Sequence, residues 1–218
     1  MEVLPVKTRL LIYALSLIAV ARLAAGAEPA VDKDGWQSLF DGKNMGNWKP
    51  ADFSSNGKIE IKDGAIRIGT GKPMSGIVWS NQPPTRMDYE IEMEAMRTEG
   101  GDFFCGLTFP VGTNPCTFIV GGWGGTMTGL SSIDGYDASE NETSGSMKFD
   151  NNRWYVIRVK VVSDKIEAWI DGKQMVNLDT TNRKISIRWE VDACVPLGVA
   201  TWCTGSAVRN IRIRKFGS

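Results

Sequence analysis

Four carboxylates lie close together in one acidic stretch of the chain, at Asp134, Asp137, Glu140 and Glu142. Like charges at this spacing repel one another unless a cation neutralises them or one carboxyl keeps a proton through a raised pKa. The stretch therefore predicts either acid and base catalysis or the binding of a divalent cation such as Ca²⁺. A solvated loop without chemistry is the third interpretation, and the Asp-x-Asp-x-Asp-Gly pattern of the common calcium loop is missing.

A tryptophan between two pairs of glycines precedes this stretch, in the segment Gly121-Gly122-Trp123-Gly124-Gly125. Glycine lets the backbone approach a ligand closely, and the face of an indole ring can stack on a sugar. Glycine in a strand also marks a bulge, so the segment is equally compatible with a strand end whose tryptophan is buried. We take Trp123, Gly122 and Gly124 as candidate substrate-binding residues and residues 121–145 as the candidate ligand loop.

A second set of carboxylates, Glu90, Glu92 and Glu94, alternates with apolar residues. Alternation places all three on one face of a strand, where a pair of them resembles the two carboxylates of a retaining glycosidase. The simpler interpretation is the wet face of an antiparallel strand, for which glutamate is a common choice.

Composition excludes several classes of function. The 218 residues include no histidine, and 25 Lys and Arg balance 25 Asp and Glu. Without histidine, a Ser-His-Asp triad, a Cys-His pair and a His-bearing zinc site are impossible. A net charge near zero argues against non-specific nucleic-acid binding, which needs a basic surface.

The first 27 residues have the pattern of a secretory signal peptide. A basic region with Lys7 and Arg9 is followed by an apolar run over residues 10–21, and Ala25-Gly26-Ala27 provides the small residues of a cleavage site. The run is too short to span a membrane, which takes about 20 residues. We expect cleavage after Ala27 and a secreted or periplasmic protein with no membrane segment, although such a segment is sometimes retained as an anchor.

Four cysteines, Cys105, Cys116, Cys194 and Cys203, follow this region. An oxidising compartment permits disulfides, and four cysteines allow three connectivities. Buried free thiols are an equal alternative, because cysteine packs as a small hydrophobe. A hairpin that turns between Pro110 and Pro115 would place Cys105 opposite a residue near Val120 and not opposite Cys116.

The elements that must position these residues are strands. Apolar and polar residues alternate with a period of two from Trp36 onward, and Asp63-Gly64 and Asp171-Gly172 are hairpin turns. No long stretch has the helical period, so the chain predicts an all-β sandwich. We expect a short tail over residues 28–34 and a single domain over 35–218. Four tryptophans in regular strand patterns are expected in the core: Trp36, Trp154, Trp169 and Trp202.

Several short motifs recur in a fixed order along the chain. They are Gly35-Trp36-Gln37-Ser38-Leu39-Phe40-Asp41-Gly42-Lys43-Asn44, Ile61-Lys62-Asp63-Gly64-Ala65-Ile66, Asp88-Tyr89-Glu90-Ile91-Glu92, Arg153-Trp154-Tyr155, Ile170-Asp171-Gly172-Lys173 and Arg209-Asn210-Ile211-Arg212-Ile213. Together they resemble the 3-keto-disaccharide hydrolase domain family over residues 35–216. The resemblance implies a concanavalin-like jelly roll of two antiparallel sheets, export from the cell and action on sugars that carry a 3-keto group.

The activity that the resemblance implies needs an acid and a base. A 3-keto group acidifies the hydrogen at C2, so a general base can remove it, the glycosidic oxygen at C1 can leave, and water can then add back. The resemblance assigns no catalytic residue, because the family pattern departs at residues 100–107 and 117–125. The candidates for the acid or base therefore remain the carboxylates of the 121–145 loop. The alternative is a glycan-binding module without catalysis that uses Trp123 as its platform.

Overall fold

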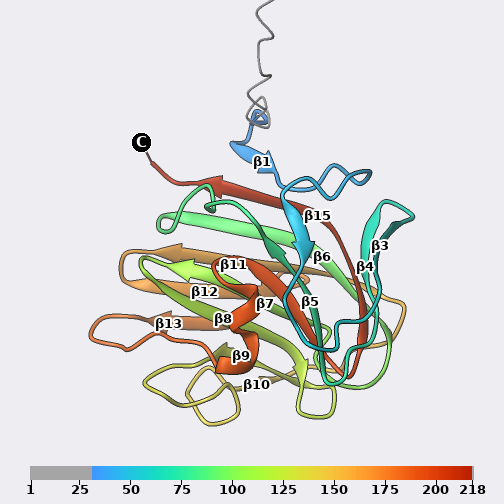
Figure 1. The fold of residues 1–218 in the computed structure, drawn as a ribbon. Coiled ribbons are helices and arrows are strands. Elements are labelled where there is room, and N and C mark those ends of the chain that lie inside the picture. The colour runs from blue at the N-terminus through green and yellow to red at the C-terminus, as the bar shows by residue number, and fades with distance from the viewer. Residues whose placement is uncertain (1–30, 218) are drawn as a thin grey trace, which may run out of the picture.

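Two antiparallel sheets, stacked face to face, form the domain (Figure 1). The computed structural model describes residues 31–217, so the expected signal peptide and the start of the tail lie outside the described part. The first sheet has eight strands and the second has seven. Within the described residues no helix is long and apolar enough to cross a membrane. The predicted all-β, concanavalin-like jelly-roll fold is confirmed.

The first sheet contains the two longest strands of the domain. Its strand order is β13-β12-β11-β6-β15-β4-β3, and β1 pairs with β15 beside this path. The bounds are β1 Trp36–Ser38, β3 Ile59–Lys62, β4 Ala65–Ile68, β6 Tyr89–Glu99, β11 Trp154–Val162, β12 Lys165–Ile170, β13 Lys173–Asp179 and β15 Gly205–Lys215.

The second sheet has the order β10-β9-β8-β7-β14-β5-β2. The bounds are β2 Trp48–Pro50, β5 Met74–Trp79, β7 Cys105–Val111, β8 Asn114–Gly122, β9 Met127–Ser131, β10 Gly145–Ser146 and β14 Gly198–Trp202. A single 3-10 helix among the described residues, η1 Trp189–Cys194, packs against β5 and β14.

The predicted hairpin turns are present. Asp63 and Gly64 join β3 to β4 with positive φ angles of 54° and 73°, and Asp171 and Gly172 join β12 to β13 with 50° and 77°. Positive φ at both central residues is the geometry that matches the twist of a tight hairpin, and Asp-Gly favours it. The alternating patterns were therefore sufficient to place these strands.

The core lies between the two sheets. Alternate residues of β6 and β11 point into it from the first sheet, and alternate residues of β7 and β8 from the second. Trp48 and Trp79 meet edge to face there, with ring centres 5.3 Å apart. A second, smaller apolar cluster covers part of the outer face of the second sheet, where η1 contributes Val191 and Cys194.

The outer face of the first sheet corrects one expectation and decides between two interpretations. Three of the tryptophans expected in the core, Trp36, Trp154 and Trp169, lie on this outer face, each beneath an arginine. The glutamates Glu90, Glu92 and Glu94 face the same way and form ion pairs with arginines of β15. These glutamates therefore belong to the outward, solvent-facing side of an antiparallel strand and not to a catalytic pair, since an arginine neutralises the charge of each of them.

The four cysteines are free thiols. Cys105 lies opposite Val120 in the β7–β8 pair, as the hairpin argument predicted, while Cys116 lies opposite Phe109. Cys105, Cys116 and Cys194 are buried, and burial raises the pKa of the Cys105 and Cys116 thiols to about 12. These three thiols are therefore poor nucleophiles, because the thiolate is the reactive form.

Candidate functional site

A pocket opens on the outer face of the second sheet, with a volume of about 270 Å³. Ligand pockets commonly hold ~300–1,000 Å³, so this one has room for a single small ring. Its apolar lining is Met74, Phe103, Ile119, Val191, Trp123 and Trp202. Its polar lining is Asp102, Thr117, Ser131, Arg188 and Glu190.

The period of the strands explains which side chains reach the pocket. In β8, Thr117 and Ile119 face the pocket, whereas their neighbours Phe118 and Val120 point into the core between the sheets. Side chains of a strand alternate between its two faces, so one strand supplies both the core and the site. The end of β14 supplies Trp202 in the same way.

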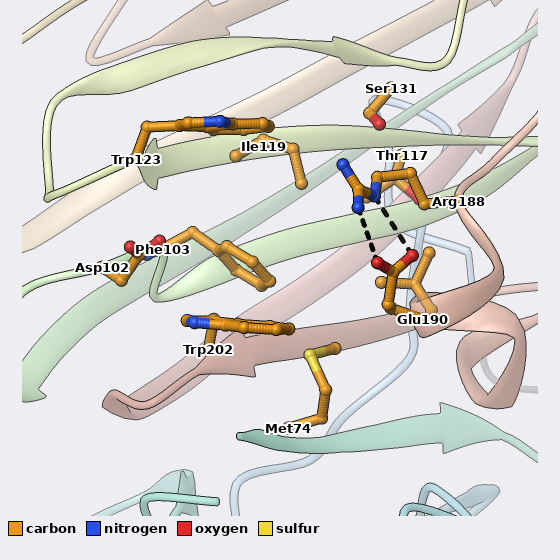
Figure 2. Close-up of a pocket in the computed structure, with 11 residues that line it drawn as sticks. Met74, Asp102, Phe103, Thr117, Ile119, Trp123, Ser131, Arg188, Glu190 and Trp202 are labelled. Atoms are coloured by element: carbon orange, nitrogen blue, oxygen red, sulfur yellow. Dashed lines mark hydrogen bonds and ion pairs between the residues drawn. The ribbon is translucent and has the colours of Figure 1, made fainter. Parts of the chain in front are cut away.

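Two indole rings frame one side of the pocket. Trp123 and Trp202 lie on opposite sides of Phe103, and both face the space in front of Arg188 and Glu190 (Figure 2). Trp123 is 46% exposed, so nearly half of its surface is free for contact with a ligand. Trp202 was expected in the core, but its position on the outer side of β14 makes it a wall of the pocket instead.

The loop that carries Trp123 is held in a backbone shape that glycine permits. Trp123 itself has a φ of 46°, an uncommon angle for a residue with a side chain. Gly125 has a φ of 106°, and a Cβ there would lie 2.7 Å from the Gly101 carbonyl oxygen and 2.9 Å from Nη1 of Arg97. The backbone N–H of Gly124 donates a hydrogen bond of 3.1 Å to Asp102. These contacts fix the turn that presents the indole.

Gly122 and Gly124, the other candidate binding residues, flank this indole. Gly122 is the last residue of β8 and pairs with Met127, and a Cβ there would lie 2.9 Å from Cγ2 of Ile119. Gly124 is exposed and binds Asp102 through its backbone. Both glycines therefore position Trp123, and only its side chain reaches the pocket.

An ion-pair network forms the opposite wall. Arg188 donates to both carboxylate oxygens of Glu190, at 2.6 Å from Nη2 and 3.1 Å from Nε, and its Nη1 bonds to Asp137. Asp137 also accepts hydrogen bonds from the Ser131 hydroxyl at 2.7 Å and from the Ala138 N–H at 2.6 Å. Asp137 therefore anchors Arg188, which in turn orients Glu190 toward the pocket.

Two arginines bind three of the four predicted carboxylates. Arg183 bonds to Asp134 at 2.6 Å and also to Glu142, whereas Asp137 binds Arg188. Glu140 is exposed, and its backbone N–H donates to the Asp137 carbonyl. The expectation that a metal cation or a retained proton neutralises the cluster is thus corrected, because guanidinium groups distant in sequence supply the positive charge.

These pairs shift the pKa values in the direction that favours charged side chains. The Arg188 hydrogen bonds lower the pKa of Glu190, and those of Arg183 lower the pKa of Glu142. The Lys184 backbone N–H, followed by Arg183, lowers the pKa of Asp134. Glu190 is therefore an ionised carboxylate at neutral pH.

No group of three or more Asp, Glu or Cys side chains within residues 31–217 is placed to hold a metal ion. The Ca²⁺ interpretation of the 134–142 stretch therefore has no set of converging ligands in the described part of the chain. Three of the four carboxylates that it required are engaged with Arg183 and Arg188.

Six polar or aromatic residues of the site were absent from the sequence-based candidates: Asp102, Phe103, Thr117, Arg188, Glu190 and Trp202. The segment Arg188-Trp189-Glu190 places opposite charges on either side of an aromatic residue, which is the one local signal that could have drawn attention to it. For Asp102 and Trp202 no local signal exists, because their role depends on which face of the second sheet they occupy.

Solved structures share this fold with the chain at low sequence identity. The carbohydrate-binding module CBM66 from Bacillus subtilis aligns with a TM-score of 0.51 and 12% identity, covering 78% of this chain and 96% of its own. Domain 4 of AbnA, a GH43 extracellular arabinanase from Geobacillus stearothermophilus in complex with arabinotriose, has a TM-score of 0.51 and 13% identity over 83% and 91%.

A third neighbour, the Crh5 transglycosylase in complex with NAG, aligns with a TM-score of 0.57 and 9% identity, covering 88% of this chain and 87% of its own. At these identities the likeness extends to the fold. No curated protein sequence matches the chain.

The family model named 3-keto-alpha-glucoside-1,2-lyase-like domain matches residues 35–214, which is nearly the whole described domain. The match bears out the resemblance found in the short sequence motifs. The chain therefore belongs to the 3-keto-alpha-glucoside-1,2-lyase-like domain family.

Proposed function

We propose that this protein binds a 3-keto-glucoside in the pocket of the second sheet and cleaves its glycosidic bond by elimination. One observation carries the proposal. An ionised carboxylate, Glu190, is held by Arg188 on one wall of a ring-sized pocket, and two indole faces form the other side (Figure 2). Family membership supports the substrate class. Two structural neighbours support a sugar ligand, since one is a carbohydrate-binding module and another was solved with arabinotriose.

In the first step the Glu190 carboxylate accepts the proton from C2 of the sugar. The electron pair of the C2–H bond moves toward C3 and places negative charge on the former keto oxygen. Protonation neutralises Glu190, so its hold on the Nε and Nη2 hydrogens of Arg188 weakens. These donors then stabilise the enolate oxygen, which is the electrostatic role that preorganised hydrogen-bond donors serve in enzymes.

In the second step the electron pair returns from the enolate oxygen and the C1–O bond breaks. The aglycone leaves as an alcohol after it takes up a proton from water, and a C1–C2 double bond remains conjugated with the keto group. Addition at C1 of the hydroxide left by that water, with return of the Glu190 proton to C2, completes a net hydrolysis. Trp123 and Trp202 would hold the ring so that C2 faces the carboxylate.

Exchange of the C2 proton tests the proposal most directly. In D₂O, the wild-type protein should exchange the C2 hydrogen of methyl 3-keto-α-glucoside and release methanol, both followed by NMR. Glu190→Gln should slow both by about 10²–10⁴-fold, the usual contribution of a positioned base. Glu140→Gln is the matched control, because Glu140 is an exposed carboxylate of the same region and does not line the pocket.

A glycan-binding module is the second candidate function, and one observation favours it. Both carboxylates that contact Arg188 are already engaged in ion pairs, as in a site built for rigidity. A binding module predicts that the sugar binds with no exchange at C2 and no methanol release. Wild-type protein that binds the ketosugar without exchange would therefore replace the lyase proposal by this one.

We also propose that the protein is exported and cleaved after Ala27, because the Ala25-Gly26-Ala27 pattern follows a basic and an apolar region. The cleavage point lies outside the described residues. Mass spectrometry of protein from the periplasm or medium should give a chain that begins at Glu28, and an intact N-terminus there would contradict the proposal.

A further inference from the structure

Arg97 is a buried arginine whose charge no described carboxylate neutralises. It belongs to β6, is 7% exposed and forms no ion pair with an Asp or Glu of residues 31–217. Its Nε donates a hydrogen bond of 2.6 Å to Oδ1 of Asn151, and its Nη2 donates one of 2.6 Å to the carbonyl oxygen of Phe149. The third nitrogen, Nη1, is buried and has no hydrogen-bond partner in the same part of the chain. Because a guanidinium is planar and rigid, the two bonds fix the position of Nη1.

This nitrogen lies against the segment that carries Trp123, residues 121–125, which we name the Trp123 turn. A Cβ on Gly125 would be 2.9 Å from Nη1, so the guanidinium closes the space on that side of Gly125. The N–H of Gly125 donates a hydrogen bond of 3.1 Å to the carbonyl oxygen of Gly122, which closes the turn around Trp123. Arg97 therefore supports one end of the Trp123 turn from its buried side.

The other end of the turn rests on two aromatic rings that Arg97 also contacts. A Cβ on Gly121 would lie 3.1 Å from Cε1 of Phe104 and 3.4 Å from Cδ2 of Phe149. The guanidinium carbon of Arg97 is 5.8 Å from the centre of the Phe104 ring, and the Phe149 carbonyl accepts the bond from Nη2. The two rings meet edge to face, with their centres 5.3 Å apart. One arginine side chain is therefore linked to both ends of the Trp123 turn.

A lone charge is an unfavourable choice for a buried position. A buried charge that lacks an opposite charge lowers the stability of a fold, and a well-packed apolar side chain of similar volume is often at least as stable. The unpaired N–H groups of Nη1 add to this cost. Trp123, in contrast, needs support, because its φ of 46° is uncommon for a residue with a side chain and persists only where neighbouring contacts fix it. The contacts of Arg97 with the turn provide such support.

We propose that Arg97 is a positioning residue for the pocket, which holds the Trp123 turn from its buried side and so fixes the indole that faces the ligand. Arg97 does not line the pocket, so it acts through Trp123 and not through contact with a ligand. The inference rests on the proposed function for the identity of the ligand alone, since the contacts that hold the turn are present without it. Removal of the guanidinium should therefore loosen the turn and weaken sugar binding.

A double-mutant cycle tests whether Arg97 acts through Trp123. Arg97→Met keeps an unbranched stem and removes the charge and the N–H donors, and it should weaken binding of methyl 3-keto-α-glucoside about fivefold in calorimetry. In the Trp123→Ala background the same change should have an effect of less than about 1.5-fold, because the ring that Arg97 positions is gone. Arg97→Lys keeps the charge without the planar fork and should bind as weakly as Arg97→Met. Arg153→Met is the matched control, since Arg153 stacks on Tyr155 of the same aromatic cluster at 4.3 Å.

Two results of the cycle would overturn the proposal. One is wild-type binding by both Arg97 variants. The other is an equal loss of binding in the presence and in the absence of the Trp123 ring, which would show that Arg97 acts without it. The value kcat should stay at the wild-type level in Arg97→Met, because the Arg188–Glu190 wall is unchanged, and a fall in kcat without a rise in KM would also contradict a role through Trp123.

Amide hydrogen exchange without ligand separates this proposal from the lyase proposal. In the Arg97 variants the N–H of Gly125 should exchange about tenfold faster than in the wild type, while the N–H of Val159 in β11 keeps its rate. If the wild type neither binds nor turns over the ketosugar, the lyase proposal fails, and faster exchange confined to the Trp123 turn still supports the role of Arg97. Unchanged exchange at Gly125, or an equal rise at Val159 from a general loss of stability, overturns that role.

Discussion

The outer faces of the two sheets carry the same residue types and use them in opposite ways. On the first sheet, arginine guanidinium groups cover the indoles of Trp36, Trp154 and Trp169 at 4.0–4.7 Å. The same face pairs its glutamates with arginines. On the second sheet, Trp123 and Trp202 have no arginine over their faces within the described residues.

The difference between covered and uncovered indoles shows how a site is recognised in a fold in which both sheets have a solvent-exposed face. An indole under a guanidinium has already found its partner and stabilises the domain, with a cation–π contact of ~0.5–2 kcal/mol. An indole beside a pocket, with its face free, contributes less to folding and is available to a ligand. Residue type alone therefore does not indicate the site. The site is indicated by an indole ring whose face no guanidinium covers.

The largest effect should follow from removing a covered indole. Trp36 is only 8% exposed and lies under both Arg212 and Arg214. Trp36→Ala should lower the free energy of unfolding by about 3 kcal/mol, at the low end for a buried tryptophan. Urea denaturation measures this. Turnover per folded molecule should stay at the wild-type value, and a loss of turnover would contradict the division between the two faces.

Removing the indole of Trp123, whose face no described arginine covers, should weaken ligand binding and change stability little, which is the reverse of the effect at Trp36. Trp123→Ala should weaken sugar binding about tenfold, or 1.4 kcal/mol, in calorimetry. It should change the free energy of unfolding by less than ~1 kcal/mol, because nearly half of the side chain is exposed. A loss of ~3 kcal/mol or more in stability would show that Trp123 is a core residue and would end its assignment as a platform.

An arginine can be introduced to cover the indole of Trp202, in the way that arginines of the first sheet cover the tryptophans of that sheet. Arg158 lies opposite Trp169 in the β11–β12 register and stacks on it at 4.3 Å, and Met74 holds the same register position opposite Trp202. Met74→Arg should therefore cover Trp202 and weaken sugar binding about fivefold, or 1 kcal/mol, with Trp202 still present. Met74→Leu is the control for the loss of methionine. Equal binding by all three proteins would contradict the role of Trp202.

The ion pairs of the first sheet should contribute modestly. Arg209 bonds to one oxygen of Glu94 through two nitrogens, at 2.7 Å and 2.9 Å, and both side chains are partly exposed. Glu94→Gln should cost about 1 kcal/mol or less, and added salt should reduce the difference from wild type. Chemical denaturation in urea at two salt concentrations measures it. A loss of sugar turnover in Glu94→Gln would instead restore the glycosidase interpretation of this strand.

The smallest effect should come from titration at the pocket. Arg188 lowers the pKa of Glu190 from its ordinary value of 4.5 in the folded protein. The contribution of this carboxylate to stability is therefore complete above pH 4.5 and is lost as the pH falls below that value. In Glu190→Gln, the stability measured by urea denaturation should decline less steeply between pH 5 and pH 3. An identical decline would show that the Arg188–Glu190 pair does not stabilise the fold.

Much of the fold could be predicted from the sequence because its signals are local. The alternation of residues 89–96 and 154–162 and the two Asp-Gly turns correspond to strands and hairpins in the structure. The same alternation separated Glu90, Glu92 and Glu94 from the core side of their strand. The short family motifs lie at these turns and strand ends, so they identified the domain without identifying its site.

The candidate site was only partly accessible to the same reasoning. The sequence pointed to Trp123, whose flanking glycines mark a tight turn, and the structure places that ring at the pocket. Residues 121–145 do not act as one loop. They contain the end of β8, all of β9 and the first residue of β10, and three of their four carboxylates divide between Arg183 and Arg188.

The amino-acid sequence by itself determined the strands, their turns and the face on which each side chain lies relative to its neighbours, because these depend on backbone preferences over a few residues. Only the tertiary structure decided on which sheet arginines cover the outward-facing indoles. Asp137 and Arg188 are 51 residues apart, and Glu94 and Arg209 are 115 apart. Such pairs form because the folding of the sheets brings distant segments together. Charge neutralisation and the exposure of an indole face depend on those contacts and on no local pattern.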